Sequence, residues 1–157
     1  MIAAHPAATA KLNRDDAAFP EPDANVLYVL HYPTEVTITQ EGFFGVGTSC
    51  TNFGGYHGNI QLDFTHGRLL VAYAVIPDCG TFGDLTGLDA ITATESHELV
   101  EAATDPYPKD DPAFANTDSD HAFWGFALGG GENGDLCAQD PASFTRFPEL
   151  KYVVQRS

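Results

Sequence analysis

Basic residues are scarce in this chain of 157 residues, which has 7 Lys and Arg against 22 Asp and Glu and a formal net charge of −15. Nucleic acids and anionic membrane surfaces bind proteins through basic faces, so the composition argues against both as partners. No apolar run approaches the roughly 18 residues of a membrane span, so we expect no membrane insertion. An acidic chain of this kind suits a soluble protein that holds a cation or that simply stays dispersed.

Cysteine is also rare: Cys50, Cys79 and Cys137 are too few for a disulfide scaffold and too scattered for a zinc knuckle. Their odd number leaves at least one thiol unpaired within this chain. Residues 1–24 show little periodicity and are rich in Ala, Pro and Asp, so we expect a loose N-terminal arm. This arm has neither the basic nor the apolar region of a signal peptide. Either export is not encoded in this chain or a leader has been removed.

Apolar residues, in contrast, are plentiful enough for a core, because 43% of the chain is hydrophobic and its length fits one domain. The strongest strand signal is Leu69 to Ile76, and the one convincing helical period runs from about Gly87 to Ala103. Residues 106–120 are predicted to form a loop. The other predicted strands are 25–31, a segment around Val36 and Ile38, 60–64, 121–128 and 152–157. We therefore predict an α+β fold with a mixed, mostly antiparallel sheet, one central helix and long loops, in a single domain over residues 25–157.

The predicted helix has two distinct faces. Its apolar side chains fall on one broad face of a 3.6-residue wheel, which we expect to pack on the core; they are Leu88, Leu99, Val100 and Ala103. His97 and Glu101 are four residues apart and share another face, with Glu98 beside them. The polar face is therefore the part of the helix that carries chemistry.

Residues 97–101 read HExxE, a variant of the HExxH motif of zinc peptidases. In HExxH, two histidines four residues apart bind zinc from one side of a helix, and the intervening glutamate acts as general base on the zinc-bound water. This pattern predicts that His97 and Glu101 are metal ligands and that Glu98 is the catalytic base. Carboxylate oxygens bind Zn²⁺ at about 2.0–2.2 Å, so Glu101 is a competent ligand. Its negative charge lowers the Lewis acidity of the ion, which slows hydrolysis or shifts the preference toward harder ions.

The alternative is a solvated polar helix face that binds nothing. Against it, Glu95, Glu98 and Glu101 crowd one helix, and no Lys or Arg occurs between Arg68 and Lys109. Uncompensated carboxylates repel one another unless they share a cation or a proton. A bound cation would relieve this repulsion.

A catalytic zinc ion normally has three protein ligands and a water, so a third ligand must come from elsewhere in the chain. Glu132 and Asp135 lie in the glycine-bounded segment GENGDLC, which has room to fold back over the helix. Asp105, at the end of the helix, and His57, among glycines, are further candidates. His31 and His121 lie at strand ends and are expected to be structural.

Three segments in order resemble motifs of bacterial relatives of the plant phosphate-induced, exordium-type protein family. They are Cys50 with Gly55-Tyr56-His57-Gly58, then SHELVEAATDP over 96–106, then GENGDLC over 131–137. In that family a segment like HELxE is followed by one like EIxDLC, and the resemblance covers roughly residues 25–157. Asn133 stands where an apolar residue is more usual.

The resemblance implies an exported or cell-surface protein with a zincin-like metal site, but it supplies no substrate. The family's polar positions correspond to His57, His97, Glu98, Glu101, Glu132 and Asp135. Together with an oxidising compartment, the resemblance implies a Cys50–Cys79 disulfide that closes a loop containing His57; the alternative is three buried, unreactive thiols. Bacterial members continue past the position of Ser157 into a tail with another cysteine, which implies that Cys137 has no partner in this chain.

Two functions remain open from the sequence. The first is a zinc-dependent hydrolase, most naturally a metallopeptidase acting on a peptide or protein, in which Glu98 activates water. The second is a non-catalytic secreted binding or structural protein in which Zn²⁺, Ca²⁺ or another divalent cation pins the helix to residues 131–137. A third reading, another metal-dependent reaction such as a cyclisation or isomerisation, also fits the residues.

Overall fold

The computed structural model describes residues 22–42, 45–64, 67–113, 120, 132–138 and 140–156. Its centre is a three-stranded sheet in the order β1-β5-β4, built from β1 (Leu27–Tyr32), β5 (Gly67–Pro77) and β4 (Tyr56–Phe64). β1 runs parallel to β5, and β4 runs antiparallel to it. The predicted α+β fold with a mixed sheet is confirmed, and the strand predicted as the strongest is the central one. The zincin-like part of that prediction stays a prediction.

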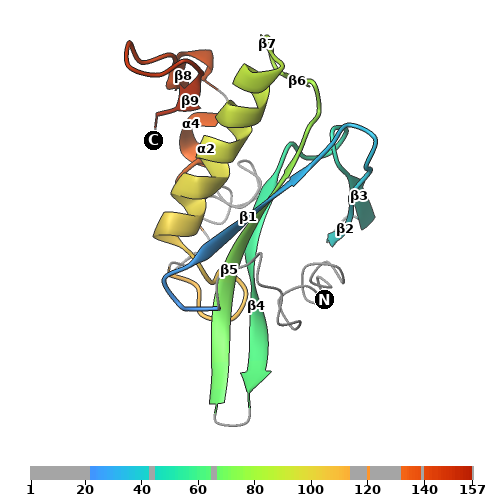
Figure 1. Ribbon diagram of the computed structural model, residues 1–157, viewed down its shortest axis with the longest axis vertical. Coiled ribbons are helices and arrows are strands. Elements are labelled where there is room, and N and C mark those ends of the chain that lie inside the picture. The colour runs from blue at the N-terminus through green and yellow to red at the C-terminus, as the bar shows by residue number, and fades with distance from the viewer. Residues whose placement is uncertain are drawn as a thin grey trace.

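Short antiparallel pairs and one long helix complete the described chain (Figure 1). The pairs are β2 (Thr39–Gly42) with β3 (Gly45–Thr48), β6 (Thr81–Phe82) with β7 (Leu85–Thr86), and β8 (Phe144–Thr145) with β9 (Val154–Gln155). The helices are α2 (Leu88–Thr104), α4 (Asp135–Ala138) and the single 3₁₀ turn η1 (Pro141–Ser143). The predicted strand 121–128 and most of the predicted arm lie outside the described residues. None of the described helices is long and apolar enough to cross a membrane.

The two faces of the central sheet differ because side chains alternate along each strand. One face carries the apolar core, whose buried members are Tyr28, Ile38, Ile60, Leu62, Val71, Tyr73 and Val75. The other face carries Ala72 and Ala74 of β5, both buried. His57 of β4 pairs in register with Ala74 and therefore lies on this second face. α2 lies on one side of the sheet and the β2–β3 hairpin lies on the other (Figure 1).

The predicted apolar face of the helix is wrong. Leu88 is 61% exposed and Leu99 is 37% exposed, and Ala103 is exposed as well. The buried side of α2 instead consists of small and acidic residues: Ala90, Ala93, Thr94, Glu98, Glu101 and Ala102. Small side chains let the helix approach the alanines of β5 closely, and the two buried glutamates face His57. The periodicity of large apolar residues therefore did not identify the face that packs.

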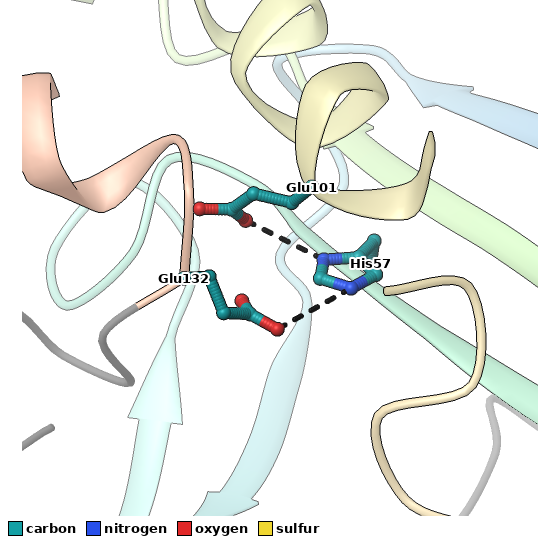
Figure 2. A group of neighbouring side chains, drawn as sticks. All are labelled: His57, Glu101 and Glu132. Atoms are coloured by element: carbon teal, nitrogen blue, oxygen red, sulfur yellow. Dashed lines mark ion pairs between the residues drawn. The ribbon is translucent and has the colours of Figure 1, made fainter. Parts of the chain in front are cut away.

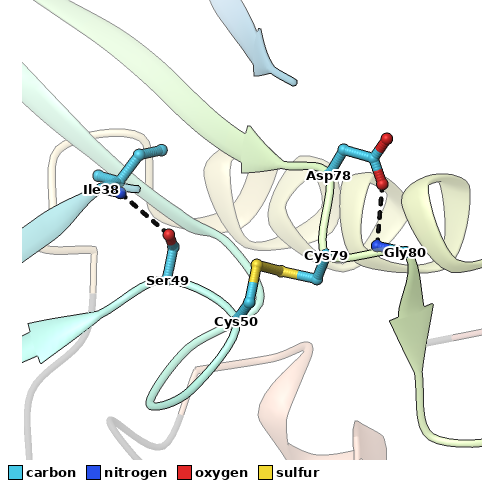
Figure 3. Close-up of a disulfide and its surroundings, with 6 residues drawn as sticks. All are labelled: Ile38, Ser49, Cys50, Asp78, Cys79 and Gly80. Carbon is cyan, nitrogen blue, oxygen red and sulfur yellow. Dashed lines mark hydrogen bonds between the residues drawn. A yellow bond between two sulfur atoms is a disulfide. The ribbon is translucent and has the colours of Figure 1, made fainter. Parts of the chain in front are cut away.

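The segment around Val36 and Ile38 is not a strand, which corrects the prediction; β2 begins only at Thr39. A turn intervenes, in which the Val36 amide donates to the Pro33 carbonyl at 2.9 Å, and Val36 remains exposed. Ile38 is buried, and its amide donates to Ser49 Oγ at 3.0 Å (Figure 3). The Ser49 amide in turn donates to the Ile38 carbonyl at 2.8 Å. These two hydrogen bonds fix the position of Ser49, the residue before Cys50.

The Cys50–Cys79 disulfide is present, as predicted, and Cys137 is a free thiol. The disulfide joins the loop after β3 to the end of β5 (Figure 3). The loop that it closes contains the whole of β4, including His57. The Gly80 amide donates to Asp78 Oδ1 at 2.9 Å, and this hydrogen bond closes a turn around Cys79.

Candidate metal centre

Four separated stretches of chain bring polar side chains to the sheet face beneath α2. β4 supplies His57, α2 supplies His97, Glu98 and Glu101, the segment 132–138 supplies Glu132 and Asp135, and β9 supplies Gln155. A cleft of about 600 Å³ reaches the two histidines and four carboxylates of this group. We call His57, His97, Glu98, Glu101, Glu132 and Asp135 the acidic cluster.

His97, Glu101 and Asp135 form the first group of candidate ligands. His97 Nε2 lies 3.1 Å from Glu101 Oε1 and 3.7 Å from Asp135 Oδ1. Because His97 and Glu101 are four residues apart, they project from one side of a single helical turn. Ligand atoms held at about 2.0–2.2 Å from a tetrahedral Zn²⁺ ion lie about 3.4 Å apart, close to both distances. The spacing thus suits a cation between the three side chains.

His57, Glu101 and Glu132 form a second group of candidate ligands (Figure 2). His57 Nδ1 lies 3.4 Å from Glu101 Oε2, and His57 Nε2 lies 3.5 Å from Glu132 Oε1. His57 is almost fully buried, whereas Glu132 reaches the group from the segment that precedes α4. Glu101 belongs to both groups.

Each histidine has an oxygen acceptor on the ring nitrogen that faces away from Glu101. His97 Nδ1 lies 2.8 Å from Gln155 Oε1, and His57 Nε2 lies 3.1 Å from the carbonyl oxygen of Asp105. These oxygens only accept hydrogen bonds, so the ring nitrogens facing them carry the proton. When a metal ion displaces the second proton of each ring, His97 Nε2 and His57 Nδ1 present lone pairs on the side that faces Glu101. Metal-binding histidines commonly have an outer hydrogen bond of this kind, which fixes the tautomer.

Gln155 is itself held in place, which fixes its acceptor oxygen toward His97. Its side-chain Nε2 donates to the Gly134 carbonyl at 2.5 Å, and its backbone amide donates to Ser96 Oγ at 2.7 Å. The Gly134 carbonyl only accepts, so the amide nitrogen of Gln155 must face it and the amide oxygen must face His97.

Two glycines permit this close assembly. A Cβ atom on Gly134 would lie 2.8 Å from Glu101 Oε1 and 2.9 Å from His97 Nδ1. A Cβ atom on Gly55 would lie 2.8 Å from Glu98 Oε1. Real Cβ contacts are not this short, so any larger residue would displace the cluster.

Glu98, the predicted general base, is buried beside the ligands. It is 4% exposed, and its Oε2 lies 3.7 Å from His57 Nδ1. Burial raises the pKa of Glu98, and this outweighs the opposing effect of the nearby histidines. A carboxylate whose pKa is raised toward neutrality is better suited to accept a proton from water.

The carboxylates also shift the pKa values of the histidines. Burial lowers the pKa of His57, but interactions with Glu101 and Glu98 outweigh burial and raise that pKa to about 10. Burial also lowers the pKa of His97, but interaction with Glu101 outweighs burial and raises that pKa to about 9. Burial would raise the pKa of Glu101, yet the two histidines bring it down to about 2. In the absence of a cation, the protonated histidines are therefore the counter-charges of Glu101.

One buried oxygen of the acidic cluster has no hydrogen-bond partner among the described residues. Glu101 is 3% exposed, and its Oε1 makes no hydrogen bond despite lying 3.1 Å from His97 Nε2. Leaving a charged oxygen buried and unsatisfied costs free energy. A cation between Glu101 and His97 would satisfy it, so the donor set fits a metal ion.

Six of the predicted site residues lie together in the acidic cluster, and the other candidates make different contacts. Asp105 contributes its backbone carbonyl to His57, while its side-chain Oδ1 accepts from the Ala113 amide at 2.9 Å. Glu95, which the sequence grouped with the other helix glutamates, lies apart, 3.7 Å from His31 at the surface. His121 lies outside the described residues.

Sequence reasoning missed Gln155 and the close approach of Gly134. The predicted C-terminal strand contained Gln155, but no pattern linked it to a histidine 58 residues earlier. The glycines of GENGDLC indicated only a segment with room to fold back over the helix.

No protein-family model, curated protein or solved structure matches this chain. The resemblance to the exordium-type family therefore stays a prediction, and the interpretation of the acidic cluster depends on its own geometry.

Proposed function

We propose that this protein is a zinc-dependent hydrolase that cleaves peptide bonds, with His97, Glu101 and Asp135 as metal ligands. The observation that carries the proposal is the convergence of these three side chains around His97 Nε2, at 3.1 and 3.7 Å, next to a buried glutamate. Imidazole together with carboxylate is a ligand set of catalytic zinc. The cleft of about 600 Å³ that reaches the group leaves room for a substrate.

Each side chain has a role in this proposal. A bound zinc ion supplies a Lewis acid that polarises the peptide carbonyl and activates water. Glu98 takes the proton of the attacking water and delivers it to the leaving amine. Gln155 Oε1 accepts a hydrogen bond from His97 Nδ1–H and so keeps Nε2 available to the ion. Gly134 lets the segment that carries Asp135 approach the helix.

The alternative is a non-catalytic protein in which the same cation is structural. The observation that favours it is the number of carboxylates, four in the acidic cluster, because Ca²⁺ takes six to eight oxygen ligands. Two buried histidines argue for zinc instead, since imidazole is not a calcium ligand of choice. A structural site has its coordination closed by protein ligands, whereas this group opens onto a cleft.

We also infer that the protein works in an oxidising compartment, such as the cell exterior. The support is the Cys50–Cys79 disulfide, because disulfides are rare in reducing compartments. Peptide mapping of protein from its natural host, with and without reductant, tests this. Free thiols at both positions would contradict it.

The test combines zinc analysis with a peptide-library cleavage screen on the purified chain. Glu98→Gln should keep its zinc and lose turnover by about 10²–10⁴-fold, whereas His97→Ala should lose zinc and turnover together. Glu95→Gln is the matched control, because Glu95 lies on the same helix but pairs with His31 at the surface. Wild-type turnover in Glu98→Gln, or zinc-loaded protein that cleaves nothing in the library, would reject the hydrolase proposal.

A further inference from the structure

The two oxygens of the Glu101 carboxylate face different partners. Oε1 lies 3.1 Å from His97 Nε2, and Oε2 lies 3.4 Å from His57 Nδ1. Asp135 Oδ1 lies 3.7 Å from the same His97 Nε2, whereas Glu132 Oε1 lies 3.5 Å from the other ring nitrogen of His57, Nε2. Figure 2 shows Glu101 at one ring nitrogen of His57 and Glu132 at the other. The cluster thus consists of two sets, each with one histidine and one further carboxylate, on either side of a shared carboxylate.

A single ion at the first set gives His57 no role as a ligand. His57 is 3% exposed, and it lies within 3.4–3.7 Å of Glu98, Glu101 and Glu132. A buried imidazole among several carboxylates is a potential metal ligand, and one of its ring nitrogens lies within 4.8 Å of a carboxylate oxygen of Glu101 and one of Glu132. The shortest distances, 3.4 Å to Glu101 and 3.5 Å to Glu132, are made by opposite ring nitrogens, so Glu132 must shift toward the nitrogen that binds the ion. Whichever ring nitrogen of His57 binds a cation, the other still faces an oxygen acceptor, either Asp105 or a glutamate.

The charge of the acidic cluster also favours two divalent cations. The carboxylates of Glu98, Glu101, Glu132 and Asp135 together carry four negative charges when ionised, which two divalent cations balance and one does not. Among the described residues, the ion pairs made by arginine are Arg68 with Asp63 and Arg146 with Asp89, both outside the cluster. Buried charges need partners of opposite sign, and divalent cations from solution would replace the protonated histidines in that role.

The unsatisfied oxygen of Glu101 is the independent sign of a ligand. Glu101 Oε1 is buried, lacks a hydrogen-bond partner in the described part of the chain, and is directed between His97 and Asp135. Oε2 of the same carboxylate is directed at His57. A carboxylate that offers one oxygen to each of two sets has the arrangement of a bridging ligand.

We propose that the acidic cluster binds two divalent cations, one at His97 and Asp135 and the other at His57 and Glu132, bridged by the carboxylate of Glu101. This inference rests on the proposed function, because the first ion is the one proposed there. It adds a second cation, and with it a second positive centre for the carbonyl oxygen or the free amino group of a peptide substrate. In two-metal hydrolases, paired ions stabilise both the attacking and the leaving group.

The test is metal stoichiometry on the whole chain, stripped of metal and then dialysed against a slight excess of Zn²⁺. Wild type should retain two zinc ions per chain. His57→Ala with Glu132→Gln should retain one ion, and His97→Ala with Asp135→Asn should retain the other. His31→Ala with Glu95→Gln, a histidine–glutamate pair at the surface, is the matched control and should retain both.

A second measurement does not depend on variants that fold. Wild-type protein loaded with Mn²⁺ should give the electron paramagnetic resonance spectrum of a spin-coupled pair, because a bridging carboxylate couples the two ions. The spectrum of isolated Mn²⁺ at full loading would overturn the bridged pair.

The outcomes separate this inference from the proposed function. One ion that is kept without His57 and Glu132 but lost without His97 and Asp135 overturns the second cation and leaves the proposed function standing. One ion with the opposite dependence overturns both the pair and the proposed ligands. Two ions that persist without His57 and Glu132 overturn the assignment of those ligands. No retained ion overturns both proposals.

Discussion

The two faces of the β1–β5–β4 sheet bury their side chains by different means. The face away from α2 buries large apolar residues, including Ile60, Leu62 and Val71. The face beneath α2 buries two alanines and Ile76 of β5 and, near the start of β4, His57, which faces the buried glutamates of α2. Apolar burial is favourable in water by itself, whereas buried carboxylates need a partner of opposite charge. One face therefore buries mainly large apolar side chains, whereas the other also buries a histidine and carboxylates that could hold a metal ion.

The largest expected effect comes from the apolar face. Leu62→Ala should lower the free energy of unfolding by about 2–5 kcal/mol, because Leu62 is 3% exposed and a cavity would remain. The loss, measured by urea denaturation, should be the same with and without zinc. Leu88→Ala, at a position 61% exposed, should change stability by less than about 0.5 kcal/mol. A zinc-dependent loss in Leu62→Ala would show that the two faces are not independent.

Gly134→Ala tests the acidic cluster beneath α2, and we expect it to change zinc affinity. The added Cβ would lie 2.8 Å from Glu101 Oε1 and 2.9 Å from His97 Nδ1, so the ligands must move apart. We expect zinc affinity, measured by competition with a chromophoric chelator, to fall by about 10–100-fold, the range seen when residues supporting a metal ligand are lost. Gly47→Ala is the control, because its Cβ would make only ordinary contacts at 3.6 Å. Equal affinities in the two variants would contradict the close approach.

Removing the outer partner of His97 should have a smaller effect than crowding the ligands. Gln155→Ala deprives His97 Nδ1 of its acceptor at 2.8 Å and should lower zinc affinity by about tenfold, the lower end of the range for outer partners. Gln155→Glu should restore only part of the affinity, because a carboxylate oxygen accepts the hydrogen bond from His97 Nδ1 but cannot donate to the Gly134 carbonyl. Gln61→Ala, at an exposed position of β4, should leave zinc affinity unchanged. No difference between Gln155→Ala and Gln61→Ala would remove Gln155 from the site.

The last effect concerns pH. The pKa values of His57 and His97 rise from 6.5 to about 10 and about 9 in the folded, metal-free protein. Their contribution to stability is therefore complete below pH 6.5 and is lost as pH rises through the folded-state values. We expect the Tm of metal-free protein to fall by about 2–4 °C for each kcal/mol lost over this window. Zinc replaces the protons, so its stabilising effect should grow over the same range.

The control for this pH dependence is His31→Ala, which should leave the fall in Tm unchanged. His97→Gln should make the fall shallower. A Tm that is constant from pH 6.5 to 10 in the metal-free protein would show that the histidines do not carry the counter-charge.

The sequence predicted the elements whose signal is local. β5 and α2 appear within one or two residues of their expected limits, because an apolar run and a proline after the helix define them. His97 and Glu101 were expected to share a side, because their spacing equals about one helical turn. These features depend on neighbouring residues alone.

What the sequence left undecided depends on distant contacts. Leu88 and Leu99 were expected in the core, but Ala90 and Ala93 pack instead, because close approach to the alanines of β5 favours small side chains. His57 was one candidate among several, since only the register of β4 with β5 directs it toward α2. Nothing local marked Gln155, whose partner lies 58 residues earlier.

The order in which the cluster's stretches occur along the chain has a consequence for synthesis. A ribosome that has completed α2 has made His57, His97 and Glu101 but not yet Asp135 or Gln155. Until the C-terminal stretch emerges and docks on the helix, the growing chain offers only an incomplete set of ligands, and metal affinity is coupled to folding. Under the proposed ligand assignment, tight metal retention would be reached only after Gln155 has been made. It would therefore distinguish molecules in which residues 132–156 have docked on α2 from those in which that stretch is missing or misplaced.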